Sequence, residues 1–502
     1  MSDQERRIIR FGDRLAIDRA VKNLANARNA YEMDRQAREL ATRGKPALNA
    51  LLRHLDASDP ALRGGLGRLA QHLDPEMVIP ALRQAAMDTS RTDAARLTAV
   101  MILERYLGQE IDPALAQRIP ASYDVARESG EEAIAIAETE PLVLVEYADQ
   151  LLDEPPEIVH AVLQVIKTME DPRRARLLMA VAAYGDASLQ RDIIPALGAI
   201  RHPLAVQALQ TLWHLTLPEL RPLIQRQLQK LRMAGVQAHP PGELRALWSP
   251  VNAQGHSFLW FIHHHQEENR GDLLTLILHD QLGMVYASAY PDLELNTLPM
   301  PAPKGTIHRV RMVDSHHQVL LVELDPALGL QMLDEALERM AANEAPWPGE
   351  IVVFGHWLWG DRPLPPQQIP WPPLPAPQGK EATAALLEHP AFAGWLWLLS
   401  DAFLAAHAEK TLHKDGPSHE QVVNTLLDEP NRGLLSQRLQ QQARWLQLAR
   451  QHNEASQVLA VREAIDAGDR THPFVRELAW RSLIAATADR AMRQTLRMLS
   501  PE

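Results

Sequence analysis

Apolar residues in the first part of the chain recur at the spacing of amphipathic helices. Leu62, Leu66, Leu69 and Leu73 follow the i, i+4, i+7, i+11 positions of one helix face. A shorter stripe precedes them (Leu48, Leu51, Leu52, Leu55). Asp59 and Pro60 stand between the two stripes, as a helix N-cap and a first helical residue do. The pattern predicts a helix, a tight turn and a second, capped helix.

This helical unit repeats along the chain. The triplet Pro46-Ala47-Leu48 returns as Pro80-Ala81-Leu82, 34 residues later, and Asp59 returns as Asp93 at the same interval. Later helix pairs are expected to begin at 156 and 186. A helix pair that recurs every 34 to 45 residues or so is typical of an α-solenoid, because single pairs cannot bury their apolar faces without neighbours.

The stretches 59–82 and 186–209 resemble HEAT-type helical repeats. In both, an aspartate opens a helix that carries an arginine one turn later (Arg63 and Arg191), and an Ala/Leu/Gly-rich strip follows. The resemblance covers residues 30–235 and implies a solenoid without identifying a function, since repeats of this class occur in scaffolds, chromophore lyases and DNA-alkylation glycosylases. We expect the aspartates in these repeats to cap helices (Asp59, Asp93, Asp171).

The helical period stops at the Pro-Pro-Gly break of 240–242. Short apolar runs rich in strand-forming residues follow, and the pattern predicts strands at 258–262, 273–278, 284–289, 306–313 and 319–324. Asp325 and Pro326 are predicted to open a helix, and 351–354 reads as a further strand. We therefore expect an α+β module at 245–360 with a mainly antiparallel sheet.

A proline-rich segment occupies 361–379 and is expected to be an extended linker. A polyproline ligand for an aromatic groove is the alternative interpretation. Residues 380–502 read as a C-terminal helical region with one helix at 391–408. The expected fold class is mainly α with an inserted α+β module, in which a HEAT-like solenoid at 1–236 precedes the small antiparallel-sheet domain.

Charge and cysteine content narrow the functional classes. The formal net charge is −12 and cysteine is absent, which disfavours generic polyanion binding and excludes disulfides, cysteine nucleophiles and thiolate metal sites. The first residues lack the apolar run of a signal peptide, and the stretch 391–408 carries Ser400, Asp401 and His407. We expect a cytoplasmic protein with no membrane segment.

Histidines in the α+β module are the one candidate for site chemistry. His263 and His265 share one face if their segment is a strand, and His279 with Asp280 ends the next predicted strand. Imidazoles with a carboxylate are suitable zinc ligands, so these four residues are weak metal candidates. No P-loop, dinucleotide-binding or nucleophile-elbow motif is present. No catalytic residue is assigned, and no cofactor is expected.

Three functions remain open. The first is a protein-interaction scaffold that binds partner proteins on the solenoid surface, and it is favoured because the recognisable content is repeat architecture. The second is a metal-dependent enzyme with its site in the 245–360 module. The third is a nucleic-acid-binding solenoid, for which residues 1–45 offer eleven basic against seven acidic residues. Nucleic acid is the less favoured partner, since no domain is strongly basic.

Overall fold

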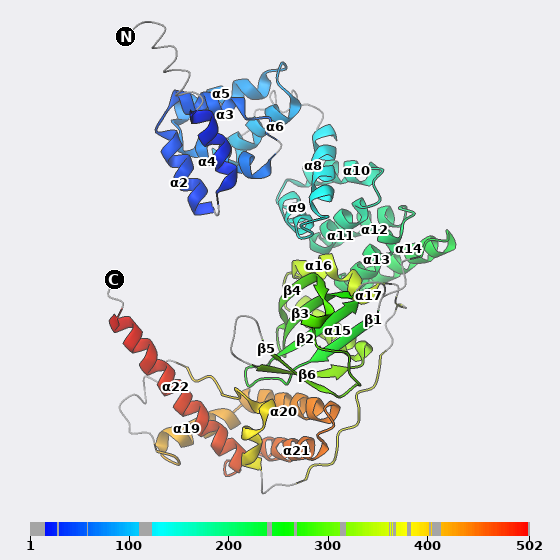
Figure 1. The fold of residues 1–502 in the computed structure, drawn as a ribbon, viewed down its shortest axis with the longest axis vertical. Helices are drawn as coiled ribbons and strands as arrows, with labels where there is room; N and C mark the ends of the chain where they lie inside the picture. The colour runs from blue at the N-terminus through cyan, green and yellow to red at the C-terminus, as the bar shows by residue number, and fades with distance from the viewer. Residues whose placement is uncertain are drawn as a thin grey trace. The chain divides into compact units, whose positions relative to one another are not determined.

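The computed structural model describes residues 16–27, 30–57, 59–109, 123–237, 243–265, 269–311, 318–360, 362, 364, 368–378, 383–400, 403 and 413–499. Their contacts divide the chain into two compact units. Unit 1 comprises 1–132 and 157–168, and unit 2 comprises 133–156 and 169–502. The described part is mostly helical, with one antiparallel sheet in unit 2 (Figure 1). No described helix is long and apolar enough to cross a membrane.

Unit 1 is built from helices, and helix α8 runs from it into unit 2. Their bounds are η1 (Asn23–Asn26), α2 (Ala30–Ala41), α3 (Lys45–Arg53), α4 (Pro60–His72), α5 (Pro75–Met87), α6 (Asp93–Met101), η2 (Ile102–Tyr106), α8 (Tyr123–Ile136) and α10 (Pro156–Thr168). Helices α3 and α4 are the predicted pair. The repeated stacking of a solenoid stays a prediction, as does the resemblance to HEAT repeats.

Of two helix N-caps predicted in unit 1, the structure confirms one and places the other at a different residue. Asp59 caps α4 and accepts a hydrogen bond from the backbone N–H of Ala61. Thr92 is the N-cap of α6, since its hydroxyl accepts the hydrogen bond from Ala95 N–H, and Asp93 is the first helical residue. The prediction for Asp93 was wrong since threonine, one position earlier, is itself a favoured N-cap.

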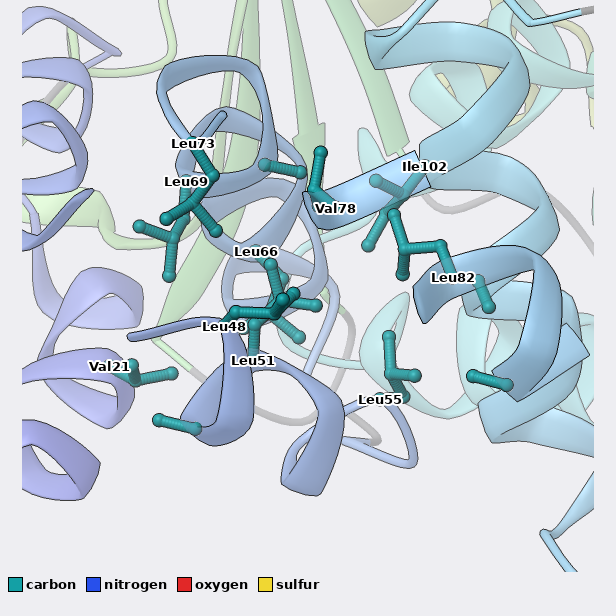
Figure 2. Close-up of a cluster of buried hydrophobic side chains, with 14 of the residues drawn as sticks. Val21, Leu48, Leu51, Leu55, Leu66, Leu69, Leu73, Val78, Leu82 and Ile102 are labelled. Carbon is teal, nitrogen blue, oxygen red and sulfur yellow. The ribbon is translucent and has the colours of Figure 1, made fainter. Parts of the chain in front are cut away.

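The leucine stripes of α3 and α4 meet in the core of unit 1 (Figure 2). Leu51, Leu66 and Leu69 are fully buried there. Glycines in α4 permit this close packing, because a Cβ atom on Gly67 would lie 2.4 Å from the ring of Tyr106 and one on Gly65 would lie 2.7 Å from the Leu24 side chain. The Ala/Leu/Gly composition of this strip therefore reflects the close approach of neighbouring segments.

Unit 2 begins with a second set of helices. They are α9 (Val143–Leu152), α11 (Arg174–Tyr184), α12 (Ala187–Leu197), α13 (Pro203–Leu215), η3 (Pro218–Leu220) and α14 (Arg221–Met233). Asp186 caps α12 and accepts from Leu189 N–H. Asp171 lies before α11, where its carboxylate accepts from Arg173 N–H at 2.8 Å instead of capping the first helical turn.

The sheet of unit 2 has six strands in the order β4-β3-β2-β1-β6-β5, and all neighbours are antiparallel as predicted. The strands are β1 (Glu243–Trp248), β2 (His256–His264), β3 (Arg270–His279), β4 (Gly283–Glu294), β5 (Ile307–Arg311) and β6 (Gln318–Leu324). Sequence analysis missed β1, a central strand. Its residues, Glu-Leu-Arg-Ala-Leu-Trp, are mostly good helix formers and include no β-branched residue, so the segment gives no strand signal.

Two layers cover the sheet. Helix α15 (Pro326–Ala342) is capped by Asp325 as expected, and a Cβ atom on its Gly329 would touch Ala246 and Phe261 on one sheet face. The other face carries an apolar cluster that includes Trp260 and Leu298. Residues 351–354 form part of helix α16 (Gly349–Phe354), followed by α17 (His356–Trp359). The strand predicted there was wrong, since four consecutive apolar residues also suit a buried helix.

The C-terminal region is helical, with short helices η5 (Thr383–Glu388) and η6 (Pro390–Phe392) before α19 (Pro417–Leu427), α20 (Asn431–Leu448), α21 (His452–Asp466) and α22 (Pro473–Leu499). The single helix expected at 391–408 is not formed, because 395–400 have no regular structure. Most of 401–412 lies outside the described residues. The Trp395 indole donates a hydrogen bond to the Val251 carbonyl at 2.7 Å, and the Trp445 indole of α20 donates to the Trp248 carbonyl at 2.8 Å. Both contacts connect the C-terminal region to the segment 248–251.

The described residues of the proline-rich segment lie along unit 2. Ile369 N–H donates to Gln331 of α15 at 3.2 Å. The guanidinium of Arg444 lies 4.8 Å from the ring centre of Trp371. Gln378 N–H donates to the Ser456 carbonyl of α21 at 3.4 Å. The segment therefore has partners within its own chain.

Candidate functional site

Strand register brings two of the four metal candidates together with a carboxylate that was not among them. His263 and His265 are two residues apart at the end of β2, and alternation puts them on one face. His263 is paired with Asp272 across the β2–β3 ladder. The side-chain ligand atoms of His263, His265 and Asp272 all lie within 4.8 Å of one another. We call these three residues the His–His–Asp cluster.

The carboxylate of Asp272 is the centre of this cluster. Its Oδ2 atom lies 2.9 Å from His265 Nε2 and 3.4 Å from His263 Nδ1. Its Oδ1 atom accepts a hydrogen bond from the backbone N–H of Asp292 at 3.0 Å. The side chain of Asp272 is 8% exposed, whereas those of His263 and His265 are 20% and 32% exposed. The carboxylate is therefore at the inner end and the imidazoles nearer the solvent.

Opposing effects act on the ionisation of Asp272. Burial raises the pKa of this carboxyl, but hydrogen bonds from His263, His265 and the Asp292 N–H outweigh burial and hold the pKa below its usual value. The charged carboxylate is thus the favoured form at neutral pH. A charged carboxylate with two imidazoles can bind a cation or orient an imidazole proton.

His279 and Asp280, the other two weak metal candidates, lie at the far end of β3. His279 is paired with His256 across the ladder, and their ring centres are 4.8 Å apart. The buried carboxylate of Asp280 accepts a hydrogen bond at 2.8 Å from Arg438 of α20. The structure therefore unites His263 with His265 but gives His279 and Asp280 separate roles.

Sequence analysis did not identify Asp272, because the residue belongs to the next strand and stands seven positions after His265. The predicted antiparallel pairing of the two strands could have identified Asp272. A residue shortly after the loop faces the residues shortly before it, so an acid at the start of β3 was a candidate partner. Gln266, Glu267 and Glu268, together with His316 and His317, lie outside the described residues.

The opposite face of the sheet carries a second buried polar group. Both nitrogens of the Arg245 guanidinium that face Glu323 lie 2.7 Å from its carboxylate. His308 Nε2 is 2.8 Å from the same carboxylate. Arg245 also donates to the Pro299 carbonyl at 2.7 Å. This network ties β1, β5 and β6 to the segment that covers them, which is a structural role.

Unit 2 also contains a cleft of about 910 Å³ between its first helices and α15. Residues from α11 to α14 and the loops between them form one wall, and α15 with the residues after it forms the other. The aromatic residues at the cleft are Trp213, His214 and Trp347. A volume of this size is in the range of ligand-binding pockets.

A contact between His214 and Asp334 connects the two walls of the cleft. His214 Nδ1 lies 2.7 Å from the Asp334 carboxylate of α15. The His214 ring stacks on Trp359 with centroids 4.3 Å apart and planes at 10°. The Arg221 guanidinium covers Trp213 at 4.3 Å from the ring centre. These contacts fix the aromatic wall from both sides.

Carboxylates outnumber cations at the cleft. Five acidic residues line it (Asp186, Asp334, Glu335, Glu338, Glu344), against the two arginines Arg221 and Arg362. Arg221 donates to the Trp213 carbonyl and Arg362 to the Leu358 carbonyl. The excess carboxylates at Asp186, Glu338 and Glu344 are exposed. The cleft is consequently suited to a cationic ligand.

No family model matches this chain, and no curated protein or solved structure is similar enough to it to count as a match.

Proposed function

We propose that this protein binds partner proteins, and that the cleft of unit 2 takes an extended, arginine- or lysine-rich segment of the partner. The observation that carries the proposal is the combination of carboxylates and indoles along one cleft of about 910 Å³. Carboxylates pair with cationic side chains through charge-assisted hydrogen bonds. The half-buried Trp347 indole can attract the same cations, whereas Trp213 is already covered by Arg221.

The length of the cleft favours an extended chain segment. Lining residues of α15 run from Ala327 to Ala341, which corresponds to about 21 Å at 1.5 Å per residue of helix. Glu335 and Glu338 are about one turn apart on this wall, and Leu217 stands on the opposite wall with 47% of its surface exposed. Alternating cationic and apolar side chains would complement such a surface.

A nucleic-acid partner is less well supported at this cleft. A polyanion such as nucleic acid would meet the excess carboxylates and be repelled.

The helices that line the first wall include 186–209, the stretch that resembles a HEAT-type repeat. The proposal therefore agrees with the expected scaffold function but needs only the cleft, not a complete solenoid.

The test is binding of labelled peptides to the full chain by fluorescence anisotropy. An arginine–alanine peptide is compared with a glutamate–alanine peptide of equal length, at low and at moderate salt. We expect the basic peptide alone to bind, with an affinity that falls as salt rises. Glu335→Gln/Glu338→Gln should weaken this binding roughly three- to tenfold.

The matched control is Glu454→Gln/Glu463→Gln, which removes two carboxylates from α21, outside the cleft lining. This control variant should bind the basic peptide as the unaltered chain does. Equal loss of affinity in both double variants would show that net charge, not the cleft, attracts the peptide. Equal binding of both peptides would overturn the proposal.

A further inference from the structure

We propose that the His–His–Asp cluster binds a first-row divalent transition-metal ion through His263 Nδ1, His265 Nε2 and Asp272 Oδ2. This site is distinct from the proposed peptide cleft and does not depend on it. Two imidazole nitrogens and one carboxylate oxygen form a three-residue ligand set. Such sets occur where further coordination positions stay open for water or a substrate.

Distances within the cluster suit a shared ion. A tetrahedral ion with bonds of about 2.0–2.1 Å separates its ligand atoms by roughly 3.3 Å, and an octahedral one by roughly 3.0 Å. Asp272 Oδ2 lies 2.9 Å from His265 Nε2 and 3.4 Å from His263 Nδ1. Two of the three ligand-atom distances are thus close to those around a bound ion, and the two imidazoles lie near enough for an ion to bind between them after their side chains adjust.

The second carboxylate oxygen already has a positioning partner. The Asp292 N–H donates to Asp272 Oδ1 at 3.0 Å, which leaves Oδ2 directed at the two imidazoles. Outer contacts of this kind fix the orientation of metal ligands and increase affinity. The ladder pairing of His263 with Asp272 fixes the same arrangement through the backbone.

Charge balance distinguishes Asp272 from the other buried carboxylates of the described chain, Asp280 and Glu323. Each of these two forms a buried ion pair with an arginine, Arg438 and Arg245 respectively. The ion pairs that Asp272 forms within the described residues are with the imidazoles of His263 and His265. A buried carboxylate needs a compensating cation, and a divalent ion between the imidazoles would supply it.

A second cluster shows the contrast. Asp415, His419 and Glu420 also lie close enough to share an ion. The Arg476 guanidinium, however, is 2.6 Å from both carboxylates. Arg476 thus already supplies the positive charge that these carboxylates require, so a metal ion is not needed there.

Ligand chemistry limits the choice of ion. Imidazole nitrogen favours zinc, iron, cobalt, nickel or copper, whereas magnesium and calcium prefer oxygen-only ligand sets. An ion with three protein ligands can polarise a substrate oxygen or lower the pKa of bound water. The partial exposure of both imidazoles leaves a route to this position from solvent.

The test is titration of the metal-free full chain with Co²⁺ and with Zn²⁺, followed by visible absorption and calorimetry. We expect one dominant site per chain, with the Co²⁺ absorption bands of nitrogen ligation. His263→Gln/His265→Gln should weaken binding more than roughly tenfold. The control His256→Gln/His279→Gln changes the histidine pair at the other end of the same strands and should bind as the unaltered chain does.

Asp272→Asn is a second variant, because asparagine keeps the shape and an oxygen that can accept from Asp292 N–H. It should also lose most affinity while remaining folded by circular dichroism. Bound metal should raise the melting temperature of the unaltered chain but not of Asp272→Asn. The proposal is overturned if the folded unaltered chain binds neither ion, or if the two histidine double variants bind alike.

Discussion

His214 Nδ1 lies 2.7 Å from the carboxylate of Asp334, although 120 positions separate the two residues. The pair joins α13 to α15, and the His214 side chain is only 3% exposed. Its ring also stacks on Trp359. This contact therefore holds together the two walls of the cleft, and the cleft depends on it for its shape.

Removing the carboxylate should destabilise unit 2. Asp334→Ala leaves a buried imidazole nitrogen without its partner, which costs about 1–3 kcal/mol. Denaturant unfolding monitored by tryptophan fluorescence measures this loss, because all eleven tryptophans lie in unit 2. Glu338→Ala on the same helix is the control and should change stability by less than about 0.5 kcal/mol. Equal effects of the two variants would contradict this role for Asp334.

A second prediction concerns the buried ion pair between Asp280 and Arg438. Arg438 donates to Asp280 at 2.8 Å and to the Ala253 carbonyl at 2.6 Å. Arg438→Met leaves the buried carboxylate unpaired and should lower the free energy of unfolding by about 3–5 kcal/mol. Arg462→Met, which breaks the more exposed pair with Asp466, should cost less than about 1 kcal/mol. Similar losses in both variants would show that the burial of an ion pair does not determine how much its removal destabilises the protein.

Much of the fold could be predicted because local signals agree with the tertiary structure. Asp59 and Asp325 each precede a proline and cap a helix, and five strand positions follow from short apolar runs. The two errors have different causes. Residues 351–354 are four consecutive buried apolar residues, so they carry no polar face from which a period can be read. Strand β1 consists mostly of helix formers and contains no β-branched residue.

The candidate site was predictable only in part. Alternation along one strand is a local property, and it correctly puts His263 beside His265. The choice between Asp272 and Asp280 depends on register, which long-range pairing sets. The cleft was not predictable at all, since its walls come from segments more than one hundred positions apart, as Gln190 and Glu335 illustrate.

His356 should make the stability of unit 2 depend on pH. Burial lowers the pKa of this imidazole to about 4, assisted by Arg176 and His263 and opposed by the Val353 carbonyl and Asp272. The unfolded chain, with a histidine pKa near 6.5, therefore binds more protons between these values. The contribution of His356 to the free energy of unfolding is therefore fully present above about pH 6.5. It is lost as the pH falls toward 4, which lowers the free energy of unfolding by up to about 3 kcal/mol.

The measurement is the free energy of unfolding across this pH range for His356→Gln and for the unaltered chain. His356→Gln cannot titrate at this position, so its stability should fall less steeply on acidification. His452→Gln, at an exposed position of α21, serves as the control and should keep the slope of the unaltered chain. Identical slopes in all three proteins would exclude His356 as the source.

Two glycines of α4 should respond oppositely to the same substitution. A Cβ atom on Gly67 would lie 2.4 Å from the Tyr106 ring, whereas one on Gly64 would lie 3.8 Å from the Tyr106 hydroxyl. Gly64→Ala should stabilise unit 1 by about 0.5–1 kcal/mol, because alanine restricts the unfolded chain and favours the helix.

Gly67→Ala should instead destabilise unit 1 by about 1–3 kcal/mol, since the Tyr106 ring has to move out of the core. Thermal unfolding followed by circular dichroism compares the two variants with the unaltered chain. The difference in sign is the decisive result, because helix propensity alone predicts that both alanines stabilise. Two stabilised variants would mean that α4 and η2 do not pack as closely as the Gly67 position requires.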